Sequence, residues 1–335
     1  MSMGRPISIS AVYIKELILK FPDHGDRTLA TLAYKKKPKL FKSKQEAYNK
    51  VKYYRGHSGD FNRKYVKDKS NIKPLNTSTE NTWDLPKSSS KPKITWNLPT
   101  SIKKVAVLSD IHFPYQDNTA LKAVLNDCVK EDVDAFYING DMLDFYSLSF
   151  HEKDPSVMDV PLSLEMGQNF FKMLKTKFPK AQVYYVPGNH EIRLERYLRI
   201  KAPELLDMKE FKLDILLKVA EIGVHYIPHA SKCYFGKLLV EHGDKLKGSG
   251  GVDPARTLFL RFKRDAICGH FHRTKDHLAK IYDGSTIMTH STGCLCELEP
   301  GYMEQNEHNH GYALVKMNNG IHNVENKKIF NGKIY

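Results

Sequence analysis

The chain has 335 residues, of which 41% are apolar and 27% charged. This length is enough for about two domains of ~150 residues, and the composition excludes a collagen, a wholly disordered chain and a disulfide-stapled miniprotein. The formal net charge is +14, and the first hundred residues, with 21 basic and eight acidic side chains, carry +13 of it. This asymmetry predicts a basic N-terminal appendage that binds a polyanion, joined to a nearly neutral globular body.

Cysteine usage and hydropathy favour an intracellular protein. Five cysteines are an odd number in a chain large enough to bury a core without disulfides, which is typical of a reducing compartment. Cys294 and Cys296 lack the two-residue gap of a zinc motif, so buried free thiols are expected. Lys15, Glu16 and Lys20 interrupt the apolar stretch near the N-terminus, and no uncharged run approaches the ~18 residues of a membrane span. We therefore expect a cytoplasmic protein without membrane contact.

Residues 1–57 are expected to form a basic helical module. One short helix is predicted over residues 28–34, and a second opens at a capping box made by Ser43 and Glu46. The apolar face of this second helix consists of Ala47, Val51 and Tyr54. The module is either helix-turn-helix-like or a helical hairpin with a solvated basic surface, since charge alone specifies no groove contact.

Residues 58–103 have the composition of a linker, rich in Lys, Ser, Asn, Thr and Pro. The pentapeptide TWDLP at 82–86 recurs as TWNLP at 95–99, and the two copies hold Trp83 and Trp96, the two tryptophans of the chain. Each tryptophan is expected to anchor an extended segment, more often on the protein's own body than on a nucleic acid.

From residue 104 onward, short β-type runs alternate with helical stretches. Strands are predicted at 105–108, 135–138, 183–186, 238–240 and 266–268, and later at 286–289, 312–316 and 322–325. Helices are predicted near 118–130, 161–177, 190–200, 210–220 and 254–263. The alternation predicts the α/β class, with a layered β-sandwich flanked by helices.

Side chains able to bind a metal follow each of the first five predicted strands. They are Asp110 and His112, then Asp141, Asn189, His242, and finally His270 with His272. Residues just beyond the carboxyl ends of strands in an α/β sheet converge on one crevice. The sequence therefore predicts that five separate segments meet at one site.

The order and context of these groups resemble the calcineurin-like metallophosphoesterase superfamily. The matching motifs are Asp110-Ile111-His112, Gly140-Asp141-Met142-Leu143-Asp144, Gly188-Asn189-His190-Glu191, His242-Gly243 and Gly269-His270-Phe271-His272. The resemblance covers roughly residues 104–325, so residues 104–335 are expected to be the catalytic domain, and it says nothing about the basic N-terminal segment.

The resemblance implies two divalent metal ions about 3.5–4 Å apart. Asp141 would bridge them. Asp110, His112 and His272 would complete one site, and Asn189, His242 and His270 the other. Mixed nitrogen and oxygen ligands suit Mn, Fe or Zn better than Ca or Mg, and Mn is the expected ion in vitro.

Three further residues receive roles near the substrate. In the resembling family the histidine after the metal-binding Asn faces the substrate, so His190 would assist the leaving oxygen. Asp144 would hold the His190 imidazole in the useful tautomer, the alternative being a helix cap or a surface acid. Arg193, about one turn onward, would face the phosphate, the alternative being a surface ion pair.

The shared centre leaves the substrate open. The superfamily's protein phosphatases carry Gly-Asp-x-x-Asp-Arg-Gly, whereas Asp144 is followed here by Phe145, so the phosphate-clamping arginine is absent. The leading hypothesis is a phosphodiesterase or nuclease, in which a metal-bridging hydroxide attacks a nucleic acid diester bound through basic residues 1–100. The alternatives are a phosphatase or a cyclic or mononucleotide phosphodiesterase, and a non-catalytic nucleic-acid-binding protein on the same scaffold.

Overall fold

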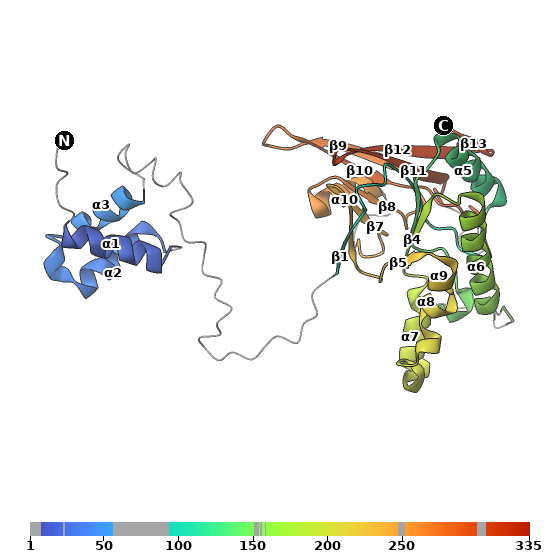
Figure 1. The fold of residues 1–335 in the computed structure, drawn as a ribbon, viewed down its shortest axis with the longest axis horizontal. Helices are drawn as coiled ribbons and strands as arrows, with labels where there is room; N and C mark the ends of the chain where they lie inside the picture. Colours follow the sequence, from blue (N-terminus) through green and yellow to red (C-terminus); the bar gives the residue numbers. More distant parts are fainter. Residues whose placement is uncertain are drawn as a thin grey trace. The chain divides into compact units, whose positions relative to one another are not determined.

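A computed structural model describes residues 8–22, 24–55, 94–150, 154, 156–157, 159–246, 252–299 and 306–335. The chain divides into two compact units, Met1–Ser90 and Lys91–Tyr335 (Figure 1). The expected extended segment at Trp83 lies outside the described residues. None of the described helices combines the length and apolar character that a membrane crossing requires.

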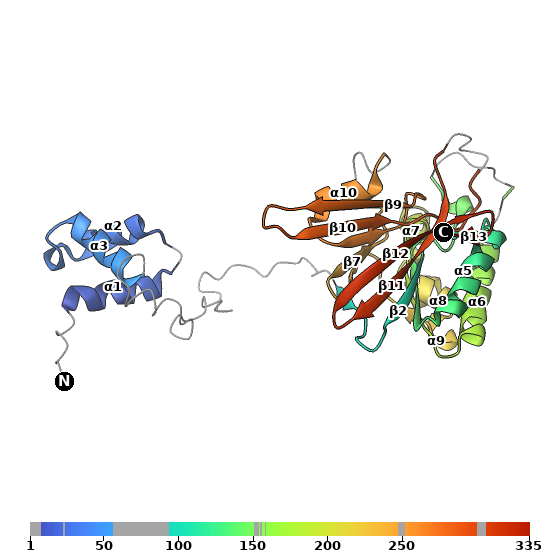
Figure 2. The ribbon, with the colours of Figure 1, turned by 90° about the horizontal axis from the view of Figure 1, so that it is seen from above.

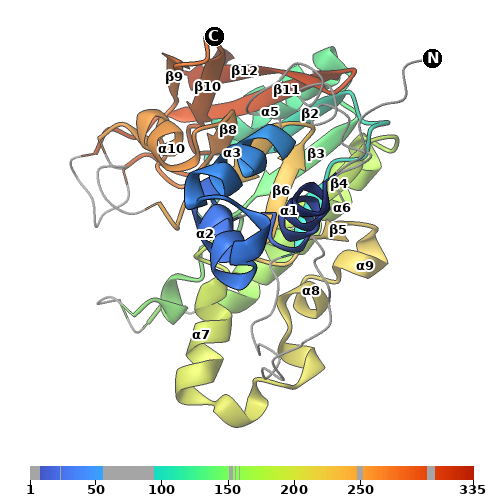
Figure 3. The same ribbon diagram turned by 90° about the vertical axis from the view of Figure 1, so that its left-hand side faces the viewer.

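In the described part of the first unit, three helices surround one small core (Figure 3). They are α1 (Ile9–Lys20), α2 (Asp26–Lys36) and α3 (Lys44–Tyr54), with a 3₁₀ turn, η1 (Pro38–Leu40), between the last two. Helix α1 was not expected from the sequence. It begins at Ser8, whose hydroxyl accepts a hydrogen bond from the Ala11 N–H at 3.3 Å, and it places Ile14 and Leu17 in the core.

The predicted apolar face and capping box of α3 are present, with one shift. Ala47 and Val51 are fully buried, and the Ser43 hydroxyl accepts from the Glu46 N–H at 3.1 Å. The Glu46 carboxylate accepts from the N–H of Lys42 at 2.6 Å, so it reaches one residue further back than the capping box requires.

The second unit is built on two sheets packed face to face. The seven-stranded sheet has the order β13-β12-β11-β2-β3-β4-β5, and the six-stranded sheet has the order β1-β6-β7-β8-β10-β9. The first consists of β2 (Lys104–Leu108), β3 (Ala135–Asn139), β4 (Gln182–Val186), β5 (His225–Tyr226), β11 (His310–Asn318), β12 (Ile321–Phe330) and β13 (Lys333–Ile334). The second consists of β1 (Thr95–Asn97), β6 (Lys232–Phe235), β7 (Leu238–Glu241), β8 (Ala266–Cys268), β9 (Lys275–Lys280) and β10 (Thr286–Ser291).

Alternation along the central strands explains the layers. In β2, Val105 and Val107 pack into the core between the two sheets, whereas Ala106 and Leu108 pack into the core beneath the helices. Helices α5 (Asn118–Glu131) and α6 (Val160–Lys177) cover this outer face (Figure 2). Helix α10 (Pro254–Phe262) packs through Leu258 on the outer face of the other sheet. A strand that is buried on both faces has a continuous apolar sequence, which is why the strand at 105–108 could be predicted.

The remaining helical segments differ more from expectation. Helix α7 (Ile192–Lys201) lies where a helix was predicted and is followed by η4 (Pro203–Leu205). The helix predicted over 210–220 is instead three short pieces, η5 (Lys209–Phe211), α8 (Leu213–Leu216) and α9 (Val219–Ile222). Lys218 interrupts it with a left-handed backbone, φ 52°. A further 3₁₀ turn, η3 (Tyr146–Leu148), follows β3.

The TWNLP segment belongs to the second unit. Strand β1 pairs in parallel with β6, and the ring of Trp96 lies 5.1 Å from that of Tyr184 and 5.9 Å from that of Tyr137, measured between centroids. The tryptophan therefore anchors an edge strand on the protein's own body.

Candidate metal centre

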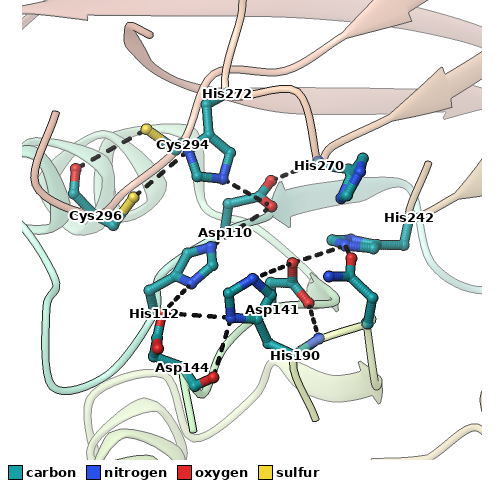
Figure 4. Close-up of polar contacts among 12 residues, drawn as sticks. Asp110, His112, Asp141, Asp144, His190, His242, His270, His272, Cys294 and Cys296 are labelled. Carbon is teal, nitrogen blue, oxygen red and sulfur yellow. Dashed lines mark hydrogen bonds and ion pairs between the residues drawn. The ribbon is translucent and has the colours of Figure 1, made fainter. Parts of the chain in front are cut away.

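The polar groups that follow the parallel strands converge on one cluster (Figure 4). Strands β2, β3 and β4 run parallel in one sheet, as do β7 and β8 in the other. The cluster draws on the loop after each of these five strands: Asp110 and His112; Asp141 and Asp144; Asn189 and His190; His242; and His270 and His272. All seven residues that the sequence analysis proposed as metal ligands lie in this cluster.

Two groups of ligand atoms share Asp141. In the first, Asp110, His112 and Asp141 offer ligand atoms within 4.8 Å of one another, and His272 Nε2 lies 3.4 Å from Asp110 Oδ1. In the second group, ligand atoms of Asp141, His242 and His270 also lie within 4.8 Å of one another. Asn189 Oδ1 lies 3.1 Å from His242 Nε2. The carboxylate of Asp141 can therefore serve both groups.

An unpaired buried nitrogen shows that the first group fits a cation. His112 Nε2 is buried without a hydrogen-bond partner among the described residues, and it lies 4.0 Å from Asp110 Oδ1, whose contact with His272 Nε2 is an ion pair at 3.4 Å. Burying a ring nitrogen without a partner is costly, whereas a divalent ion between these atoms would bind both. The other nitrogen of His112, Nδ1, contacts Asp144 Oδ2 at 2.9 Å, a carboxylate contact typical of metal-binding histidines.

The backbone of the cluster is held in an unusual conformation. Five of the seven candidate ligands have left-handed φ angles between 50° and 69°: Asp110, His112, Asp141, His270 and His272. Such angles are uncommon for residues with a side chain and concentrate at functional sites. Gly188 has no room for a side chain, because a Cβ there would lie 2.8 Å from His242 Nε2 and closer still to the Asp141 carboxylate. The loops are thus shaped around the ligand atoms.

Neighbouring acids and histidines in the cluster shift one another's pKa values. Burial raises the pKa of Asp141, but His242 and His190 outweigh it and hold that pKa well below its ordinary value. Burial likewise opposes a charge on His242, yet Asp141 raises the pKa of His242 to about 10. The buried carboxylates therefore draw positive charge to the ligand atoms around them, as a cation-binding site requires.

Asp144 joins two histidines of the cluster. It is 7% exposed, which excludes the alternative of a surface acid. Its Oδ2 lies 2.9 Å from His112 Nδ1 and 3.3 Å from His190 Nδ1, and its backbone oxygen lies 3.0 Å from His190 Nδ1. Burial raises the pKa of Asp144, but its hydrogen bonds with His112 and His190 lower it further than burial raises it. Asp144 therefore touches the His190 nitrogen at which it could set the tautomer.

Arg193 points toward the same histidine and not toward a surface acid. Its guanidinium donates to the Asp144 backbone oxygen at 3.0 Å and to His190 Nε2 at 3.0 Å. Because an arginine only donates, this contact fits the neutral imidazole, which accepts at Nε2 and donates from Nδ1 to Asp144. A protonated His190 carries an N–H at both nitrogens, so Arg193 would have to turn away from Nε2. The surface ion pair expected on α7, between Glu195 and Arg199, is formed and does not involve Arg193.

Sequence reasoning assigned no role to Glu191, which lies beneath the cluster. Its carboxylate accepts hydrogen bonds from the N–H groups of Gly188, Asp141 and Leu143 at 2.8, 3.0 and 2.9 Å. It therefore ties the loop after β3 to the loop after β4. The one signal in the sequence was its place in the Gly188–Glu191 motif.

Cys296 is a buried free thiol, as expected, and it also contacts a candidate ligand. All five cysteines are free and buried. The Cys296 Sγ lies 3.8 Å from His272 Nδ1, on the ring edge opposite the nitrogen that faces Asp110 (Figure 4). Nothing in the local sequence around Cys296 signals this contact, since His272 is 24 positions away.

Comparisons with known proteins identify the family of this chain. The 30–31% identical Gene 54 proteins of Mycobacterium phages D29 and L5 align over 189 residues, or 51% of this chain and 69% of each relative. Among solved structures, Vps29 with Zn²⁺ from Entamoeba histolytica is 12% identical with a TM-score of 0.39, covering 69% of this chain and 96% of that one. The YfcE phosphoesterase from E. coli is 15% identical with a TM-score of 0.30, covering 63% and 87%. The family model for calcineurin-like phosphoesterases matches residues 103–274, a span that holds every candidate ligand from Asp110 to His272, and the chain belongs to that family.

Proposed function

We propose that this protein is a dinuclear metal-dependent phosphodiesterase that hydrolyses nucleic acid. The observation that carries the proposal is the pair of ligand groups that share Asp141. Asp110, His112 and His272 would hold one ion with Asp141, and Asn189, His242 and His270 the other. The mixture of imidazole nitrogens with carboxylate and amide oxygens favours Mn, with Fe or Zn as alternatives.

Two divalent ions bound there would activate a water molecule and neutralise charge on the phosphoryl oxygens. The protein's own contribution would come from His190, whose Nε2 lies 3.8 Å from Asp141 Oδ2 and whose other nitrogen is held by Asp144. Once the Arg193 guanidinium turned from His190 to the phosphate, Nε2 would be free to carry a proton and donate it to the leaving oxygen as that atom gains charge. A phosphate oxygen would accept from the Arg193 N–H groups, which now donate to His190.

Basic side chains of the first unit support a nucleic acid as the substrate. Most lysines on α1–α3 and their connections are exposed, whereas Lys50 and Lys52 are half-buried, and the exposed ones suit contact with backbone phosphates. Several tyrosine rings lie under these lysines, as Tyr13 does under Lys37 at 4.4 Å and Tyr54 under Lys15 at 5.1 Å. We therefore infer that this unit binds chiefly through phosphate contacts and less through stacking of bases on tyrosine.

The proposal is tested by removing the shared ligand. Protein treated with a chelator should be inactive on bis(p-nitrophenyl) phosphate and on single-stranded DNA, and Mn should restore both activities. Since even partners outside the ligand set of a metal site cost about 10–100-fold when mutated, Asp141→Asn should lower kcat/KM by more than about 100-fold. Asp276→Asn, which removes a carboxylate paired with His290 outside the cluster, is the matched control and should keep normal turnover. Wild-type turnover in the Asp141 variant would refute the proposed site, and DNA binding without metal or turnover would favour the non-catalytic alternative.

A further inference from the structure

A cavity of about 380 Å³ opens directly beside the candidate metal centre. His112, Asp144 and His272 of the centre form one of its walls. Its other described walls include Tyr115, Tyr146, Val157, Glu297, Glu299 and His308. This volume lies in the usual range for small-molecule sites, about 300–1,000 Å³. An ester whose phosphorus lay at the metal centre would therefore extend one substituent into the cavity.

Hydrogen bonds hold two of the cavity walls in place. The Tyr146 hydroxyl accepts from the N–H of Asp154 at 2.9 Å, and the Tyr146 N–H donates to the Asp159 carboxylate at 2.6 Å. On another wall, the N–H of Glu297 donates to the backbone oxygen of Tyr115 at 2.9 Å. Two phenol rings and a carboxylate are thus presented by backbone that is already ordered, which lowers the cost of binding a rigid group.

The charge of the cavity opposes a second phosphate. Glu297 and Glu299 are exposed at its walls, Asp144 is shared with the metal centre, and the described lining contains no lysine or arginine. Carboxylates repel a phosphate and accept hydrogen bonds from N–H groups. The substituent that enters the cavity should therefore be uncharged, flat and equipped with N–H donors.

We propose that this cavity binds an unpaired nucleobase with an exocyclic amino group, attached to the phosphate that is cleaved. The inference rests on the proposed function and names the part of the nucleic acid that the site reads. Tyr115 and Tyr146 would stack on the base, and Glu297 or Glu299 would accept from its amino group.

Guanine fits best, because its imino and amino N–H groups lie side by side and match the two oxygens of one carboxylate. Thymine and uracil fit worst, because carbonyl oxygens flank their single imino N–H and would face the same carboxylate. A base paired in a duplex has these donors occupied, so the cavity selects single strands, strand ends or extruded bases.

The experiment compares the p-nitrophenyl esters of 5′-GMP and 5′-TMP with bis(p-nitrophenyl) phosphate, all with Mn. The KM of the guanosine ester should be about tenfold lower than that of the thymidine ester, the range expected for one bidentate base contact. The double variant Glu297→Gln with Glu299→Gln should reduce this ratio to nearly one. Glu307→Gln is the matched control, because Glu307 pairs with Arg273 and does not line the cavity, and it should keep the wild-type ratio.

Equal KM values for the two nucleoside esters in the wild type, or a preference that survives the double substitution, would overturn the inference. If the protein hydrolysed none of the three esters, the result would count against the proposed function instead. In that case calorimetric titration with 5′-GMP and 5′-TMP still decides the question. Tighter binding of GMP that is lost in the double variant supports the base site, and equal affinities refute it.

Discussion

The two units of this protein use charge in opposite ways. In the first unit the basic side chains lie on the surface around a core of apolar residues, and Ser10 is the one buried polar residue among those described. In the second unit the net charge is close to zero, yet buried ionisable groups such as Asp110, Asp141 and Glu191 gather at one place. Exposed charge attracts a polyanion at long range, whereas buried charge is costly and marks the site of chemistry.

The largest effect is expected from His190→Ala. Loss of a general acid lowers kcat by about 10²–10⁴-fold, while the two ligand groups stay intact. Steady-state kinetics on a diester should show this loss, and metal analysis should show normal Mn content. His225→Ala, which removes an exposed histidine stacked on Tyr184, should change neither. An unchanged kcat in the His190 variant would remove this residue from the chemistry.

The next largest effect is expected from Glu191→Ala, and it is on stability, because Glu191 holds loops together and does not face the substrate. The change leaves three buried N–H groups without their acceptor, at about 1–3 kcal/mol each, so the free energy of unfolding should fall by several kcal/mol. Chemical denaturation measures the decrease, and Glu195→Ala on the exposed side of α7 is the control. Equal stability of the two variants would show that the carboxylate does not hold the loops together.

A smaller effect is expected for Cys296→Ala. The substitution removes the sulfur beside His272 Nδ1, and a partner outside the ligand set is worth about 10–100-fold in metal affinity. Cys294→Ala removes an equally buried thiol that does not contact His272, and Cys296→Ser should recover part of the affinity. Chelator competition for Mn measures all three variants, and equal affinities for Cys296→Ala and Cys294→Ala would rule out a positioning role.

The charge of the first unit should appear in the salt dependence of binding. Replacing exposed Lys35, Lys36 and Lys39 with Gln should lower the slope of log K against log salt on single strands. The decrease should be about 0.7 for each phosphate that a lysine no longer neutralises. The same change at Lys172, Lys177 and Lys180 of the second unit is the control. If the control variant showed an equal decrease, the polyanion would bind elsewhere.

The smallest effect concerns an ion pair away from the metal centre. Burial raises the pKa of Asp127, but hydrogen bonds from Lys327, at 2.7 Å, and from Tyr312 lower it overall. A carboxylate with a depressed folded pKa stabilises the fold above its unfolded value, about 3.9, and loses that contribution as the pH falls through the folded pKa. Asp127→Asn should therefore cost about 1 kcal/mol at pH 7 and progressively less below pH ~4. A pH-independent difference in unfolding free energy would show that packing is responsible.

The elements that carry the site could be predicted from the sequence, and others could not. Strands β2, β3, β4, β7 and β8 are buried runs followed at once by polar groups, so their pattern marks both the strand and the site. Helix α1 was missed because apolar residues occur all round it: Ile9 and Leu19 are exposed while Ile14 and Leu17 are buried. The break at Lys218 depends on a left-handed backbone angle that no apolar period records.

Within the site, the sequence pointed to side chains that could bind an ion directly but not to those that support them. Side chains such as Asp141 were proposed from residue type and position. Glu191 instead accepts hydrogen bonds from backbone N–H groups, and Cys296 contacts the far edge of the His272 ring; these partners come together only in the folded chain. The roles of His190, Asp144 and Arg193 stay predictions, although all three side chains contact one another.

The pairing of β1 with β6 sets a practical limit on how the chain can be shortened. The family match begins at residue 103, but Trp96 already covers Tyr137 and Tyr184 from the edge of the six-stranded sheet. A fragment trimmed to the match would expose those rings and leave one side of β6 with open hydrogen-bonding groups, the kind of edge that promotes aggregation. An expression fragment of the second unit should therefore begin no later than Lys91.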